Sequence, residues 1–152
     1  MKITFKNRQG STFHEDLHIF IPELGIDGYS DTYYFADDNG ILPGEMSEAK
    51  VKIVLKNLLI DWEYAVENLK DNCTTYLPFD FSDQSIEALK VQRKKDQVLI
   101  SQAWTLATGG MSPSFMNKIN FNDREFNVCD RSMTIPIEQF LSEIRRERDR
   151  IS

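Results

Sequence analysis

The sequence predicts an α+β fold in which a mostly antiparallel sheet packs against a long central helix and a C-terminal helix. Three observations support this fold class. Apolar and polar residues alternate in several short stretches, as strands require. Residues 47–70 instead carry apolar side chains three and four positions apart, which is helical spacing. Several strand-like stretches are joined by short turns, so hairpins are expected more than parallel crossovers.

The N-terminal region predicts three strands. Residues 1–6 form the first, and Asn7–Ser11 have the composition of a hairpin turn. The return strand has a period-two face made of Phe13, Leu17, Ile19 and Ile21. Tyr29–Ala36 is aromatic and polar, which indicates a third strand before the loop at residues 37–40.

The central helix is the clearest element of the pattern. Ser47 is its expected N-cap, and Asp71-Asn72 is its expected end. Its apolar stripe consists of Val51, Leu55, Leu58, Trp62, Ala65/Val66 and Leu69. The stripe predicts that one face of the helix, Trp62 included, lies against the sheet.

The C-terminal half predicts a further hairpin and a second helix. Residues 86–92 and 97–106 are strand-like and are joined by a charged turn. Val98, Ile100 and Trp104 share one face of the second strand, so Trp104 is also expected in the core. Another strand is expected within residues 118–129. Thr134 then serves as an N-cap for a helix with Pro136 in its first turn and an apolar stripe of Ile137, Phe140, Leu141, Ile144 and Ile151.

Composition predicts one cytoplasmic domain spanning residues 1–152, with a net charge of −6. Cys73 and Cys129 form no C-x-x-C pair and lie 56 positions apart, so no disulfide scaffold is expected and a reducing cytosol is the default. The N-terminus lacks the apolar core of a signal peptide. Residues 97–117 carry no charge but are too polar for a membrane span. No cofactor is expected.

Charge is distributed unevenly along the chain. Between Gln9 and Ala49 there are nine carboxylates and no lysine or arginine, with six aromatic residues among them. Such a field repels nucleic-acid phosphates and anionic lipid and attracts a basic partner, most readily a basic protein. The expected partner-binding residues are Asp27, Asp31, Tyr33, Tyr34, Asp37, Asp38 and Glu45.

One motif points to a different chemistry. His14-Glu15-Asp16-Leu17-His18 satisfies H-E-x-x-H, in which two histidines bind zinc and the glutamate activates a water molecule. That site requires a helix, because only helical spacing brings positions i and i+4 together. Pro22 and the alternating apolar residues favour a strand instead. We therefore expect no metal site and no enzyme, with a small zinc hydrolase as an alternative.

A second set of segments carries a resemblance. Leu77-Pro78-Phe79-Asp80-Phe81-Ser82-Asp83 predicts a capped turn with Phe79 and Phe81 in the core. The chain here resembles small acidic immunity proteins of bacterial polymorphic-toxin systems, including contact-dependent growth inhibition. The resemblance lies in this stretch and its continuation to Ile86 and Val91, and in Gln102–Thr105 and Ser112–Ser114. The resemblance implies stoichiometric inhibition of a cognate toxin, often a basic nuclease. A non-enzymatic adaptor domain is the other alternative.

Overall fold

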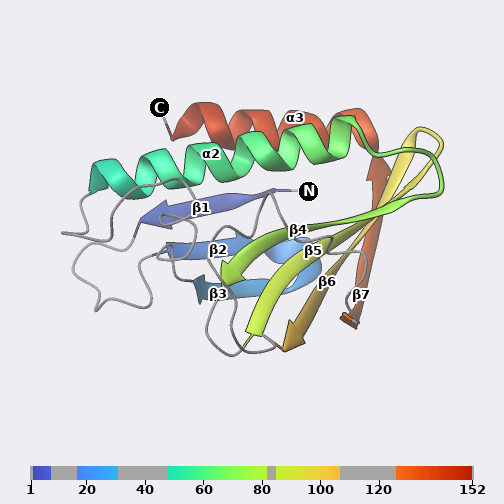
Figure 1. The fold of residues 1–152 in the computed structure, drawn as a ribbon, viewed down its shortest axis with the longest axis horizontal. Helices are drawn as coiled ribbons and strands as arrows, with labels where there is room; N and C mark the ends of the chain where they lie inside the picture. The colour runs from blue at the N-terminus through green and yellow to red at the C-terminus, as the bar shows by residue number, and fades with distance from the viewer. Residues whose placement is uncertain (1, 8–16, 31–47, 82–84, 107–125, 152) are drawn as a thin grey trace.

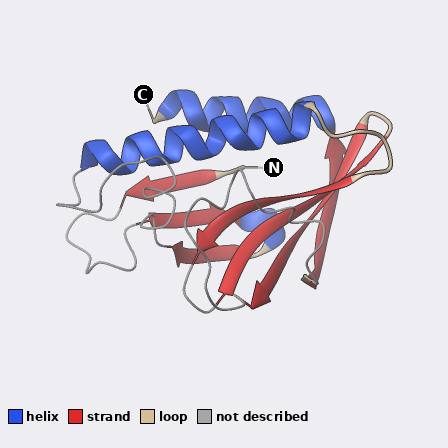
Figure 2. Ribbon diagram, viewed as in Figure 1, coloured by secondary structure: helices blue, strands red, loops and turns tan. Residues whose placement is uncertain are grey.

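The computed structural model describes residues 2–7, 17–30, 48–81, 85–106 and 126–151. Within these ranges the protein is α+β, as the sequence predicts. It has a three-stranded and a four-stranded antiparallel sheet, and two helices that lie side by side above them (Figure 1). Figure 2 shows that the two sheets run in different directions beneath this helical layer.

The smaller sheet is built from the N-terminal strands. Its order is β1 (Thr4–Asn7), β2 (Leu17–Ile21) and β3 (Ile26–Ser30). Leu17, Ile19 and Ile21 are buried, so the predicted alternation along β2 is confirmed. The third strand begins earlier than predicted, since β3 starts at Ile26 directly after a short 3-10 turn, η1 (Pro22–Leu24). Of the predicted hairpin turn at residues 7–11, Asn7 instead belongs to β1, and the remaining residues, like Phe13, lie outside the described residues.

The predicted central helix is α2 (Glu48–Glu67), which ends before the expected end at Asp71-Asn72. The expected N-cap of the helix, Ser47, lies outside the described residues. The members of its predicted stripe from Val51 to Leu69 are buried, except that Ala65 is only partly buried. Its C-terminal end is fixed to the larger sheet through the turn that follows the helix. The Arg93 guanidinium donates to the Leu69 carbonyl (2.7 Å), and the Asp71 carboxylate accepts from the Lys95 amide (2.6 Å). A cation at the C-terminal end of a helix is favourable because free carbonyls concentrate negative charge there.

The larger sheet is a meander of β4 (Thr74–Phe81), β5 (Ser85–Lys94), β6 (Gln97–Leu106) and β7 (Asn127–Pro136). The prediction of a capped turn at residues 77–83 is wrong for Leu77–Phe81, which belong to β4. Proline is tolerated there because β4 is an edge strand and the pairing with β5 shifts between Pro78 and Asp80. The extra residue at this bulge, Phe79, is buried, as predicted.

Trp104 departs from the prediction. It has the same strand parity as the buried residues Val98 and Ile100, but its side chain is 39% exposed. The core therefore covers this face of β6 at the Val98 end and leaves the Trp104 end open to solvent.

The boundaries at the C-terminal end also differ from the prediction. β7 spans Asn127–Pro136, so Thr134 and Pro136 are strand residues, and α3 (Ile137–Arg150) begins after them. Pro136 takes the N-cap position, with an extended ψ of 138°. The predicted apolar stripe of α3 is confirmed, because Ile137, Phe140, Leu141, Ile144 and Ile151 are all buried.

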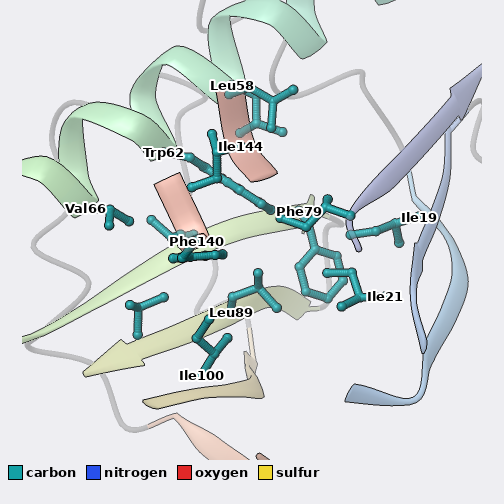
Figure 3. Close-up of a cluster of buried hydrophobic side chains, with 14 of the residues drawn as sticks. Ile19, Ile21, Leu58, Trp62, Val66, Phe79, Leu89, Ile100, Phe140 and Ile144 are labelled. Carbon is teal, nitrogen blue, oxygen red and sulfur yellow. The ribbon is translucent and has the colours of Figure 1, made fainter. Parts of the chain in front are cut away.

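The two sheets and both helices share one hydrophobic core. Figure 3 shows Trp62 pointing from α2 toward Phe79, with Ile19 and Ile21 of the smaller sheet on one side. Phe140 and Ile144 of α3 close the cluster from the helical layer (Figure 3). The indole Nε1 of Trp62 donates to the Pro78 carbonyl at 2.9 Å inside this core.

Candidate protein-binding surface

The solvent-facing side of the smaller sheet brings together polar and aromatic side chains. Residues alternate between the two faces of a strand, so the residues between the buried positions of β2 and β3 point outward. The register places His18 opposite Tyr29 and Phe20 opposite Asp27. We call these four residues the outer cluster.

The outer cluster is held by contacts between its own members. His18 Nε2 lies 2.7 Å from Asp27 Oδ1, and a carboxylate can only accept, so Nε2 carries the proton. The His18 ring centroid is 5.2 Å from that of Tyr29 and 6.4 Å from that of Phe20. The histidine therefore links the acid to both aromatic rings.

The members of the outer cluster differ in how far their side chains are exposed to solvent. Tyr29 is 52% exposed, whereas the His18 side chain is only 24% exposed. The Asp27 side chain is 66% exposed. A partner would thus meet Tyr29 and the carboxylate of Asp27 first, with His18 beneath them as a support. Exposed aromatic side chains with a fixed orientation are common anchors in protein interfaces.

Of the predicted partner-binding residues, Asp27 lies in this cluster. The other six, Asp31, Tyr33, Tyr34, Asp37, Asp38 and Glu45, lie outside the described residues. Phe20 and Tyr29 are two of the six aromatic residues in the acidic stretch, but the sequence does not predict them as partner-binding residues. The signal that could have found them is their period-two spacing from His18 and Asp27 on the two strands.

Another acid of the same stretch has a structural role. Glu23 Oε1 accepts a hydrogen bond from the backbone amide of Lys2 at 3.1 Å, which ties η1 to the chain just before β1. Burial alone would raise the pKa of Glu23, but hydrogen bonds from the backbone amides of Glu23 and Lys2 outweigh it and lower the pKa below its ordinary value. Not every carboxylate of the acidic stretch is therefore available to a partner.

The histidine motif is only partly described. Leu17 and His18 belong to β2, whereas His14, Glu15 and Asp16 lie outside the described residues. Because His18 lies on a strand and contacts Asp27, the helical spacing that a zinc protease motif needs is missing at this end. Among the residues that the structure describes, no group of three His, Cys, Asp or Glu side chains is placed to hold a metal.

The arginines near the C-terminus are held in ion pairs. Arg145 contacts Glu63 (2.6 Å) and Glu67 (2.5 Å) of α2, and Arg148 also pairs with Glu63. The hydrogen bonds to Glu63, and then those to Glu67, raise the pKa of Arg145. Arg145 and Arg148 therefore join α3 to α2.

The larger sheet carries a small hollow of about 180 Å³. It lies among residues of β5, β6 and β7, including Lys90, Ser101 and Cys129. Its lining combines a single lysine and a single aspartate with neutral side chains. The outer cluster, whose charged and aromatic side chains contact one another directly, is therefore the better defined of the two surfaces.

No family model, curated protein or solved structure matches this chain. Among the helices that the structure describes, none is both long and apolar enough to cross a membrane.

Proposed function

We propose that this protein is an immunity protein that binds a cognate toxin domain, most readily a basic nuclease, and neutralises it stoichiometrically in the cytoplasm. It would act without a cofactor and without catalytic activity of its own. The observation that carries the proposal is the outer cluster, where an exposed tyrosine and an exposed aspartate are held in place by His18.

The charge of the chain supports the same partner class. A nuclease holds its substrate through basic side chains that contact phosphates. An inhibitor with excess carboxylates is attracted to that surface and associates with it quickly. Asp27 belongs to the stretch of nine acids without a lysine or arginine, so the outer cluster lies within the most acidic part of the sequence.

Two alternative functions, an adaptor domain and a zinc hydrolase, would require different features of the molecule. An adaptor domain could use the same aromatic and acidic surface but would have no toxin partner. A zinc hydrolase would need His14 and His18 on one helical turn, which the strand position of His18 does not favour. Metal analysis of the purified protein distinguishes the hydrolase: stoichiometric zinc that is lost in His14→Ala would contradict the proposal.

The direct test first asks whether the neighbouring reading frame encodes a basic toxin-like domain, since its absence would favour the adaptor, and then uses that domain. Purified protein should bind it and block its activity at a 1:1 ratio. Tyr29→Ala should weaken the complex by about tenfold or more, as loss of an aromatic anchor commonly does. Asp27→Asn should mainly slow association and reduce its dependence on salt.

Asp96→Asn is the matched control for charge. Asp96 is exposed on the turn between β5 and β6, away from the smaller sheet (Figure 1). This variant should bind the toxin with unchanged kinetics. Equal effects of Asp27→Asn and Asp96→Asn would show that only net charge matters and would remove the outer cluster from the interface. The sequence alone adds one expectation, that neutralising Asp37 and Asp38 together also slows association.

A further inference from the structure

The solvent-facing side of α2 carries apolar residues in a regular pattern. Ile53, Ile60 and Tyr64 are 50%, 44% and 68% exposed, although α2 already buries a broad face in the core. Together with Asn57 they recur at steps of four, three and four residues. That is the spacing of the d and a positions of a heptad repeat, along which two helices pack side by side.

We call Ile53, Asn57, Ile60 and Tyr64 the Ile53–Tyr64 seam. Charged residues border this seam on both sides. Lys56 occupies the g position just before Asn57, and Asp61 occupies the e position just after Ile60. Both are exposed. In a parallel pair of identical helices, a g residue lies beside the e residue of the next heptad on the partner helix. Lys56 of each helix would then face Asp61 of the other, so the two contacts have opposite charges.

We propose that the Ile53–Tyr64 seam of α2 binds a second copy of this chain in a parallel, two-fold symmetric helix pair. The isoleucines and tyrosines stack on their own counterparts, and Asn57 meets Asn57. A polar asparagine at one a position fixes the register and favours two strands over larger assemblies. The pairing of Lys56 with Asp61 favours an identical partner in parallel register, because each helix supplies one positively and one negatively charged residue.

This assembly is independent of the proposed toxin binding. The seam lies on the helical layer, whereas the outer cluster lies on the sheet beneath it (Figure 1). Both surfaces can be occupied at once. A variant that loses the dimer should keep its affinity for the toxin, so failure of one proposal leaves the other standing.

Sedimentation of the full chain over a range of concentrations tests the proposal. The wild type should form a dimer that dissociates on dilution, and Ile60→Asp should be monomeric at the same concentrations. Val128→Asp is the matched control, because Val128 on β7 is also 44% exposed, and it should leave the dimer intact. Circular dichroism checks that each variant is folded. A monomeric wild type, or a dimer that survives Ile60→Asp, would overturn the proposal.

A charge exchange tests the orientation of the pair. Lys56→Asp and Asp61→Lys should each weaken the dimer by about tenfold, and the double variant should recover most of the loss. Asn57→Cys, made in a Cys73→Ser, Cys129→Ser background, should form a disulfide across the dimer on mild oxidation. A dimer that persists without this cross-link, or without recovery in the double variant, would contradict the parallel pairing.

Discussion

Trp62 joins packing and hydrogen bonding at one position. Its ring is 1% exposed, and its Nε1 donates to the Pro78 carbonyl next to the bulge in β4. A bulge leaves a backbone group without its ladder partner, and a buried carbonyl without a donor is costly. The indole thus donates to a buried carbonyl directly beside the irregular strand pairing.

Two substitutions separate these contributions. Trp62→Phe keeps an aromatic ring but removes the donor, so it should lower the free energy of unfolding by about 1–3 kcal/mol. Trp62→Ala should cost about 3–5 kcal/mol, because it also leaves a cavity. Urea unfolding measures both. Trp104→Phe, at the exposed tryptophan, should stay within about 0.5 kcal/mol of the wild type. An equally small loss for Trp62→Phe would mean that the hydrogen bond adds nothing.

Gly25 is required by its backbone conformation. It ends η1 with φ of +70°, and a Cβ there would lie 2.1 Å from Nη1 of Arg131. The arginine end can move aside, so the left-handed backbone is the main constraint, and Gly25→Ala should destabilise by about 1 kcal/mol. Gly28→Ala is the control, since nothing lies within 4 Å of its added Cβ. Thermal unfolding should show a lower midpoint for the first variant alone.

Sequence patterns located residues well where a single rule controls their position. The burial of Leu17, Ile19 and Ile21 follows from strand alternation, and that of Trp62 from helical spacing. Trp104 lies on the same face of β6 as Val98 and Ile100, but the core does not extend to its end of the strand. How far the core extends along a strand depends on tertiary packing. The contact of His18 with Asp27 likewise depends on the register between β2 and β3, which no local pattern specifies.

The two helices are joined by charges as well as by apolar packing. Glu63 is the central carboxylate of this contact, because it accepts from both Arg145 and Arg148, and its side chain is only 15% exposed. Glu67 contacts Arg145 and is 43% exposed. Partial burial strengthens an ion pair and makes the loss of one partner more costly.

The two glutamates should therefore differ in their contribution. Glu63→Gln should destabilise the protein by about 1–2 kcal/mol, since it leaves two arginines with a weaker acceptor. Glu67→Gln should cost less than about 1 kcal/mol, as is usual for an exposed pair. Urea unfolding at low and high salt should show that the Glu67 contribution is screened more strongly. Equal losses would contradict the central position of Glu63.

At the level of elements, the long helix and the β5–β6 hairpin were predictable because their patterns are uninterrupted. The strand β4 was missed because Pro78 and the bulge at Phe79 break the alternation that identifies strands. The boundary between β7 and α3 was misplaced because Thr134 and Pro136 have the composition of a helix start, while their backbone continues the pairing with β6. In each case tertiary pairing overrode the local signal.

The whole molecule has one core to which both sheets and both helices contribute. Elements that share a core unfold together, so a single cooperative transition is expected. Tryptophan fluorescence, which reports chiefly on Trp62, and far-ultraviolet circular dichroism should give coincident urea curves. Two separated transitions would show that the sheets are independent units and would contradict the prediction of a single domain.

For the candidate site, the sequence predicted the region of the chain involved but not the contacts between its residues. The charge asymmetry of the sequence directed attention to the stretch between Gln9 and Ala49, and Asp27 within it belongs to the outer cluster. The geometry that gives the cluster its shape arises from pairing two strands, which a one-dimensional charge pattern does not contain.

The position of α3 in the chain has a consequence for biosynthesis. Phe140 and Ile144 complete the core, and Arg145 and Arg148 neutralise Glu63, yet all four follow the other described elements in order of translation. A ribosome-bound chain that lacks α3 leaves the inner face of α2 without its final cover. The core can therefore form only after α3 has been synthesised, and a chain that still lacks α3 is a natural client for chaperones that bind exposed apolar surface.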